Sequence, residues 1–93
     1  MSDTFDRDRL DRHELDQLVA FLGRIQQEPP LRDQLNLVQT AIEVSDIAKA
    51  AGHPFQAETL IRVFEHCNEQ PYAREGLMDE KLIRVFLRRD SFL

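Results

Sequence analysis

The stretch from Asp46 to Leu60 reads DIAKAAGHPFQAETL, and it predicts a sharp corner between two helices. Gly52 is expected to end the first helix, because glycine readily adopts the positive φ angle of a helix C-terminus. Phe55 lies in the turn with a side chain of the type that is usually buried, and a second helix follows it. Helix-turn-helix proteins that read DNA have such a corner, and so do small recognition domains without chemistry. The remaining sequence has to decide between these two classes.

Length and composition predict one domain that is held together by packing alone. The chain has 93 residues, with 42% hydrophobic and 31% charged side chains, which is typical of a soluble globular protein. The single cysteine, Cys67, excludes an intramolecular disulfide, which suits a reducing cytoplasm. Residues 1–12 show no secretory signal, and no window reaches the roughly 18 apolar residues of a membrane helix. We therefore expect a cytoplasmic protein that does not enter a membrane.

Apolar periodicity predicts an all-α fold, a compact single-domain bundle of four to five short helices. Residues 1–10 are predicted to form a flexible charged tail, and residues 11–68 the main helical domain. Residues 77–93 are predicted to form a C-terminal helix that packs on this domain or on a partner. Helices are expected at about residues 11–27, from residue 30, at 40–51, at 56–68 and at 79–89.

The organisation of the middle segment is left open by its sequence. Thr40 and Glu43 have the spacing of a capping box, which predicts a new helix at Thr40. No proline or glycine enforces a break there, so a single helix over residues 31–51 stays an alternative. In either case we expect Ile42 and Ile47 to point into the core. Gly23 in the first helix is expected to allow close approach of a neighbouring backbone.

The C-terminal helix has a wide apolar surface. Its apolar side chains span roughly 220° around the helix axis, which is too wide for packing against one neighbour. Either this helix closes the core between several helices, or it presents part of its surface to another protein or to a second copy of the chain. Leu82, Val85 and Phe86 fit the inward stripe. The candidate partner-binding residues are therefore Ile83, Leu87, Phe92 and Leu93.

The sequence shows no constellation that would support catalysis or hold a metal ion or cofactor. The soft metal ligands do not have the spacing of a metal site. Cys67 falls on an apolar helix stripe, where burial would raise the pKa of the thiol and suppress its reactivity. The three glycines stand apart, so no phosphate-binding loop is formed. We expect a protein without enzymatic activity, cofactor or metal. The soft ligands in question are His13, His53, His66 and Cys67.

The DNA-binding alternative would use residues 45–66 as a helix-turn-helix. Its recognition helix would present Glu58, Thr59 and Glu65 together with one basic residue, Arg62. Acidic groups that face phosphates are unfavourable, and the net charge of −5 adds to this repulsion. Nucleic acid is therefore a disfavoured partner.

Three motifs, in order along the chain, resemble the Nif-eleven domain family, which is named for its association with nitrogen-fixation loci. The first motif has the form L-x-x-F-L. The second has the form D-P-x-L, with Glu here in place of Asp, and the third is I-A-x-x-x-G-x-x-F-x-x-x-x-L. The resemblance covers about residues 14–66. The matching residues are Leu18, Phe21 and Leu22, then Glu28, Pro29, Pro30 and Leu31, then Ile47, Ala48, Gly52, Phe55 and Leu60.

The resemblance implies a small bacterial protein that binds another protein and catalyses no reaction. Some family members are leader regions of ribosomal peptide precursors, which dock a modifying enzyme and are cleaved after Gly-Gly or Gly-Ala. This sequence contains neither dipeptide, so a free-standing adaptor or regulator is the preferred interpretation. A DNA-binding regulator and a peptide leader stay as alternatives.

Overall fold

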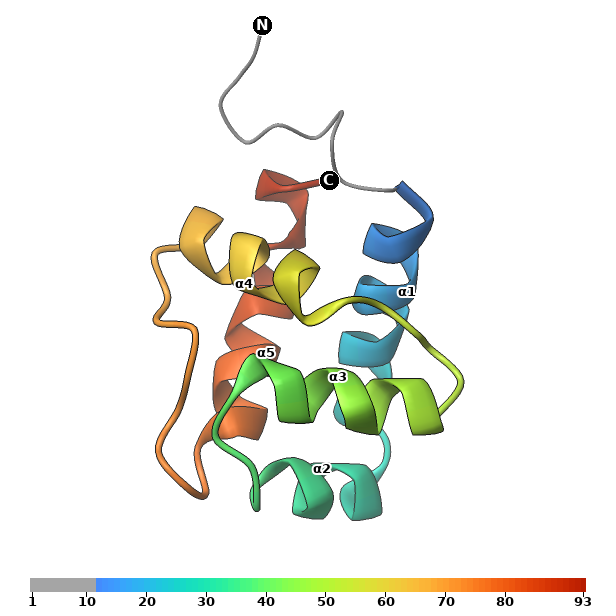
Figure 1. The fold of residues 1–93 in the computed structure, drawn as a ribbon, viewed down its shortest axis with the longest axis vertical. Helices are drawn as coiled ribbons and strands as arrows, with labels where there is room; N and C mark the ends of the chain where they lie inside the picture. Colours follow the sequence, from blue (N-terminus) through green and yellow to red (C-terminus); the bar gives the residue numbers. More distant parts are fainter. Residues whose placement is uncertain (1–11) are drawn as a thin grey trace, which may run out of the picture.

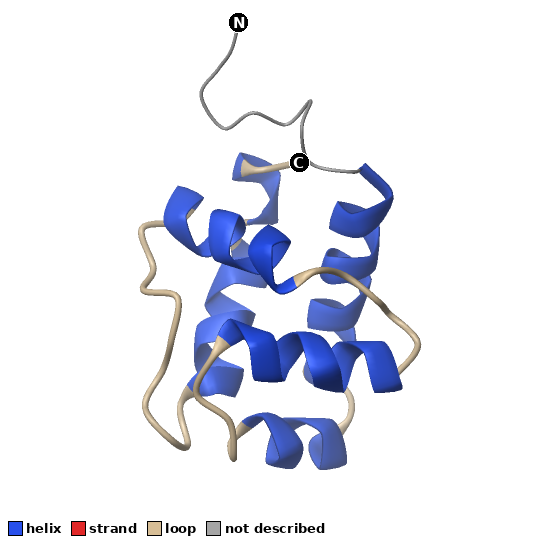
Figure 2. Cartoon of the chain, viewed as in Figure 1, coloured by secondary structure: helices blue, strands red, loops and turns tan. Residues whose placement is uncertain are grey.

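The computed structural model describes residues 12–93, and these form helices joined by loops (Figures 1 and 2). Within this range the β-type pairing is limited to one isolated antiparallel bridge between Thr40 and Tyr72. The predicted all-α single-domain fold is therefore confirmed, while the predicted tail at residues 1–10 lies outside the described residues. In chain order the helices are α1 (Arg12–Ile25), α2 (Pro29–Leu35), α3 (Ala41–Ala50), α4 (Ala57–His66), α5 (Met78–Leu87) and the short 3-10 helix η1 (Arg89–Ser91).

Local sequence signals set the helix boundaries in the middle of the chain. Pro29 opens α2, where its missing N–H leaves no helical hydrogen bond unmade. At the start of α3, Thr40 Oγ1 accepts a hydrogen bond from the Glu43 N–H at 3.3 Å, and Glu43 Oε1 accepts one from the Thr40 N–H at 3.1 Å. This capping box separates α2 from α3, so residues 31–51 form two helices. Gly52 follows α3 with a φ angle of 91°, as predicted.

The helices α1 and α5 run side by side in opposite directions, α3 packs on α4, and α2 lies at one end of the molecule (Figure 1). The largest side chains of the core include Phe21 of α1, Phe64 of α4 and Phe92 near the C-terminus, all fully buried. Gly23 of α1 faces α5, and a Cβ atom at this position would lie 3.5 Å from the ring of Phe86. The close neighbour of Gly23 is thus a side chain, whereas the sequence suggested a backbone.

The prediction that Ile42 points into the core is wrong, because its side chain is 64% exposed. The phase of α3 explains the error. Ile42 lies about 100° around the helix from the buried Ala41 and therefore faces outward. Ile47 is partly buried against the core, as expected. The inward face of α3 consists of Ala41, Val44, Ser45 and Ala48.

Side chains of α1 stabilise the predicted corner between α3 and α4. Glu14 Oε1 accepts hydrogen bonds from the Gln56 N–H at 3.1 Å and from the Thr59 hydroxyl at 2.6 Å, so a residue distant in sequence supplies the cap of α4. At the end of α3, Arg24 Nη1 donates to the Ala51 carbonyl at 2.8 Å. The corner is therefore held at both sides by α1.

Candidate docking surface

Two loops that are distant in sequence lie side by side along one edge of the molecule. They are residues 36–40, between α2 and α3, and residues 68–77, between α4 and α5; we call them the paired loops. The Ala73 N–H donates to the Gln39 carbonyl at 2.9 Å, and the Gly76 N–H donates to the Asn36 carbonyl at 2.9 Å. Together with the bridge at Thr40, these hydrogen bonds give the long 68–77 loop a defined position (Figure 1).

A buried carboxylate anchors the junction of the 68–77 loop and α5. Asp79 is 3% exposed. Its Oδ2 accepts a hydrogen bond from Arg32 Nε at 2.9 Å and forms an ion pair with Arg32 Nη2 at 2.8 Å. Its Oδ1 accepts from the Glu80 N–H at 2.8 Å. With its amide nitrogen turned toward Asp79, Asn36 donates to the same oxygen at 2.6 Å. These partners satisfy the buried charge and tie α2, the loop and α5 together.

A second polar cluster fastens the other end of this loop to α5. Lys81 Nζ donates to the Gln70 carbonyl at 3.0 Å and lies 3.4 Å from Glu69 Oε1. Glu69 also accepts a hydrogen bond from Arg84 Nε at 3.1 Å. Hydrogen bonds from Arg84, and the charges of Arg84 and Lys81, hold the pKa of Glu69 below its usual value. Glu69 is therefore ionised at neutral pH and can form its ion pairs with Arg84 and Lys81.

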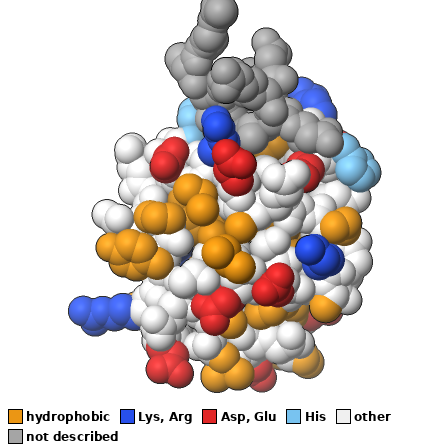
Figure 3. Space-filling view, in the orientation of Figure 1, with side chains coloured by type: hydrophobic (Ala, Val, Ile, Leu, Met, Phe, Trp, Pro, Cys, Tyr) orange, Lys and Arg blue, Asp and Glu red, His pale blue; other side chains and the backbone are white. Residues whose placement is uncertain are grey.

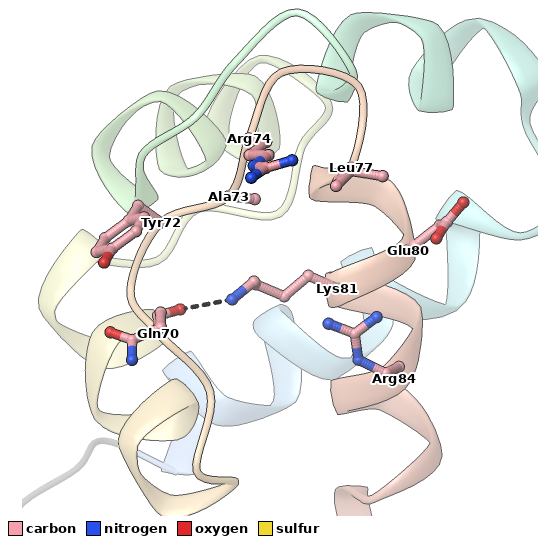
Figure 4. Close-up of a pocket in the computed structure, with 8 residues that line it drawn as sticks. All are labelled: Gln70, Tyr72, Ala73, Arg74, Leu77, Glu80, Lys81 and Arg84. Carbon is pink, nitrogen blue, oxygen red and sulfur yellow. Dashed lines mark hydrogen bonds between the residues drawn. The ribbon is translucent and has the colours of Figure 1, made fainter.

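Between the 68–77 loop and α5 lies a groove with a volume of about 320 Å³ (Figure 4). One wall comes from the loop and contains Tyr72 and Arg74, and the other comes from α5 and contains Glu80 and Arg84. Tyr72 is 57% exposed and Leu77 is 44% exposed, so these apolar side chains line the surface and do not fill the core. The full lining is Gln70, Tyr72, Ala73, Arg74, Leu77, Glu80, Lys81 and Arg84.

Exposed apolar side chains also occur on the other side of the paired loops. Leu37 in the 36–40 loop is 73% exposed, and Ile42 follows this loop in the first turn of α3. Figure 3 shows hydrophobic side chains gathered on the face where Figure 1 places α4, the start of α3 and the 68–77 loop. Exposed apolar patches of this kind are typical of interaction sites. We use the name docking surface for Leu37, Ile42, Tyr72 and Leu77 together with the groove.

The structure separates the four residues that the sequence suggested for partner binding. Leu87 is 69% exposed on α5, three residues beyond Arg84 of the groove, and Leu93 is 39% exposed. Ile83 is partly buried against the core. Phe92 is fully buried, so it belongs to the core and not to a contact surface. The reason is the η1 turn after α5, in which the Phe92 N–H bonds to the Arg89 carbonyl at 3.1 Å and the Phe92 side chain enters the core.

Sequence reasoning missed Tyr72 and Leu77 because loop residues follow no helical period. The one available signal was a tyrosine and a leucine in a loop between Pro71 and Met78 that would otherwise be expected to be polar.

None of the groups considered for chemistry lines the groove. Cys67 is 4% exposed, and its burial raises the pKa of the thiol. His66 Nε2 lies 2.6 Å from the Ser91 carbonyl, and His53 Nδ1 lies 3.1 Å from Gln17 Oε1. Among residues 12–93, no three His, Cys, Asp or Glu side chains come together as a set of metal ligands. The helices of this range are all too short or too polar to cross a membrane.

The face of α4 that a helix-turn-helix would turn toward DNA is mainly acidic. Glu58 and Glu65 are exposed, and Arg62 Nη2 lies 3.6 Å from Glu58 Oε2, so the basic group is already paired. Thr59 was expected to face the DNA, but it is 5% exposed and bonded to Glu14. This geometry gives DNA phosphates little to bind.

No curated protein and no solved structure matches the chain. A protein-family comparison finds the Nif11 domain at residues 15–60, which span α1, α2, α3 and the first turn of α4. Nif11 is not a known enzyme family. The matched range contains the corner and the 36–40 loop, whereas the 68–77 loop and α5 lie beyond it. Over residues 15–60 the chain therefore resembles the Nif11 domain, as its three motifs indicated.

Proposed function

We propose that this protein is a small Nif11-like protein of the bacterial cytoplasm that acts by binding another protein, without catalysis of its own. The observation that carries the proposal is the docking surface. Among residues 12–93, four of the six exposed large hydrophobic side chains lie at the paired loops, while Leu87 and Leu93 lie elsewhere; the four are Leu37, Ile42, Tyr72 and Leu77. Exposed apolar groups at a defined surface supply most of the free energy of protein association.

The rigidity of the paired loops supports the same proposal. A loop that is already held by Asp79, by the Glu69 cluster and by hydrogen bonds to the 36–40 loop loses little conformational freedom when a partner binds. Tyrosine is also enriched in protein interfaces, because it combines a large apolar ring with a hydroxyl group. Leu87, three residues beyond Arg84 on α5, is proposed as a secondary contact.

Photo-crosslinking in cells of the native host tests the proposal. Benzoylphenylalanine would replace Tyr72 or Leu77 in the docking surface, and Gln26, an exposed residue at the end of α1, would serve as the control position. We expect one discrete adduct of higher mass from positions 72 and 77 and none from position 26.

A second change in the same chain makes the test specific. Leu37→Asp is expected to lower the yield of the adduct at position 72 while the far-ultraviolet circular dichroism spectrum stays unchanged, because Leu37 is 73% exposed. The proposal is wrong if positions 72 and 77 give no adduct, or if position 26 gives the same adduct in the same yield.

A further inference from the structure

We propose that the groove between the 68–77 loop and α5 binds an acidic peptide segment of the partner protein. One large apolar side chain of this segment would lie against Tyr72 and Leu77, and its carboxylates would bind Arg74 and Arg84. This inference rests on the proposed protein-binding function and adds the chemistry of the partner. The residues involved lie beyond the 15–60 range of the Nif11 domain.

The size of the groove fits a peptide side chain. Its volume of about 320 Å³ is at the lower end of the roughly 300–1,000 Å³ that is usual for ligand pockets. Tyr72, Ala73 and Leu77 give it apolar walls, while its charged residues stand around them (Figure 4). A groove of this kind accepts an apolar anchor with polar or charged neighbours, which is a common form of peptide recognition.

The charge of the groove is opposite to that of the whole chain. The charged residues that line the groove are three bases, Arg74, Lys81 and Arg84, and one acid, Glu80. Glu69 pairs with Lys81 and Arg84, so the groove and Glu69 together keep an excess of one positive charge, whereas the chain has a net charge of −5. Lys81 is nearly buried and is held by Gln70 and Glu69, so it contributes to the local potential without reaching a partner. The two arginines are left to make direct contacts.

The two arginines have hydrogen-bond donors to spare. Arg84 has a side chain that is 54% exposed, and it uses Nε and Nη2 for Glu69. Its Nη1 remains for a carboxylate, since a guanidinium group carries five N–H donors. Arg74 is exposed and forms no ion pair with another residue of the described range. A carboxylate bound to either arginine forms a charge-assisted hydrogen bond.

Nucleic acid is a poorer fit for the same groove. Glu80 lines it, and the net charge of the chain is negative, so a long run of phosphates would meet repulsion around the two arginines. The apolar walls would also remain uncovered by a phosphate backbone. A short acidic segment with one apolar anchor matches both properties of the groove.

Selection from a library of random heptapeptides on the intact protein tests this inference. We expect the bound peptides to be enriched in Asp and Glu next to a large apolar residue. For the best peptide, Arg74→Glu should weaken binding by about tenfold or more, because it places like charges opposite each other. Lys49→Glu is the matched control, since it makes the same change in charge at the opposite end of α3 from the paired loops, and it should change binding by less than about twofold (Figure 1).

The position of the bound peptide is checked by nuclear magnetic resonance on the ¹⁵N-labelled protein, which also verifies that Arg74→Glu is folded. We expect the peptide to shift the amide signals of residues 70–77 and 80–84. The inference is overturned if the selected peptides are neutral or basic, if no peptide is selected, if the shifts occur elsewhere, or if a single-stranded oligonucleotide displaces the peptide from the groove more effectively than an acidic peptide does.

The outcome for the proposed function is read separately from the crosslinks. Adducts at positions 72 and 77 combined with neutral selected peptides would leave the protein-binding function in place and reject the acidic segment. If neither adducts nor acidic peptides are obtained, both proposals are wrong.

Discussion

The corner at residues 46–60 and the paired loops are both held by polar contacts, but they place their apolar side chains differently. At the corner, the Ser45 hydroxyl donates to the Phe55 carbonyl at 2.6 Å, and the Phe55 side chain is 3% exposed. In the paired loops, Asp79 and its partners hold an equally well-connected segment, yet Tyr72 is 57% exposed. At the corner, the polar contacts hold an apolar side chain in the core. In the paired loops, the polar contacts hold an apolar side chain at the surface.

This difference separates two residues that carry the resemblance to the Nif11 domain from two of the residues that we propose to bind a partner. Phe55 and Leu60 lie in the matched range and belong to a motif that resembles the Nif11 domain, and both are buried. Tyr72 and Leu77 lie outside the matched range and are exposed. The buried motif residues therefore describe how the domain packs, whereas the proposed docking surface combines Leu37 and Ile42 of the matched range with residues of the segment that follows it.

The largest expected effect is the loss of the Phe55 ring. Phe55→Ala should lower the free energy of unfolding by about 3–5 kcal/mol, because it removes buried apolar area and leaves a cavity. Tyr72→Ser is the comparison in the paired loops and should change stability by no more than about 0.5 kcal/mol. Urea unfolding followed by circular dichroism measures both. Equal losses in the two variants would mean that Tyr72 is part of the core.

Removal of the Asp79 carboxylate should have a smaller and more local effect. Asp79→Ala is expected to lower the free energy of unfolding by about 2 kcal/mol, because Asn36 and the Glu80 N–H lose a buried acceptor. The amides of Ala73 and Gly76 should exchange hydrogen faster than in the wild type. The exchange rates of the α1 amides should change only as much as the loss of global stability requires.

Asp33→Ala, at an exposed position of α2, is the matched control for this variant and should leave the exchange at residues 73 and 76 unchanged. If Asp79→Ala leaves both amides as protected as before, the carboxylate does not anchor the 68–77 loop.

The capping box of α3 lies beside the paired loops and should contribute about 1 kcal/mol to the free energy of unfolding. Thr40→Ala removes the side-chain oxygen that accepts from the Glu43 N–H. Gln39→Ala, at the preceding exposed position, keeps the backbone hydrogen bonds of the loop and should have little effect. Thermal unfolding of the two variants gives the comparison; equal midpoints would show that the cap adds nothing to stability.

The smallest expected effect is the pH dependence of the Glu69 cluster. The pKa of Glu69 in the folded protein lies below its usual value of 4.5, chiefly because Arg84 donates hydrogen bonds to the carboxylate. The unfolded chain therefore binds the proton more readily than the folded one. The stabilisation is complete above the unfolded pKa and is lost as the pH falls through the folded pKa.

Wild type should accordingly be more stable than Glu69→Gln at neutral pH, and the difference should shrink as the pH is lowered below about 4.5. Urea unfolding over a series of pH values measures this difference. A difference that stays constant down to acid pH would mean that the ion pairs with Arg84 and Lys81 do not contribute to stability.

The sequence was informative wherever a structural signal is local. The Thr40 capping box and Gly52 each act on neighbouring backbone and mark the boundaries that the structure shows, and the helix predicted to begin at Pro30 begins one residue earlier, at Pro29. Contacts between residues that are distant in the sequence could not be predicted in this way. The cap that Glu14 places on α4 spans 42 residues to Gln56, and nothing in the residues between them indicates it.

Exposure was harder to predict than helix position. Ile42 and Phe92 are both apolar, and their burial depends on the phase of α3 and on the η1 turn, which the tertiary fold determines. The groove depends on the pairing of loops 36–40 and 68–77, whose hydrogen-bonded residues lie more than 30 positions apart and have no periodic pattern. Of the residues named from the sequence, Leu87 is exposed on α5 three residues beyond Arg84, but it does not line the groove.

The antiparallel contact of α1 and α5 also limits how the protein can be shortened. Met78, Leu82 and Val85 are all fully buried, and α5 is a principal neighbour of the first helix. A fragment that ends at residue 60 would lack α5 and would expose the apolar face of α1 to water. We expect such a fragment to aggregate or to bind other proteins non-specifically. Binding measured with such a fragment would reflect this newly exposed apolar face, so experiments on partners should use a chain that retains α5.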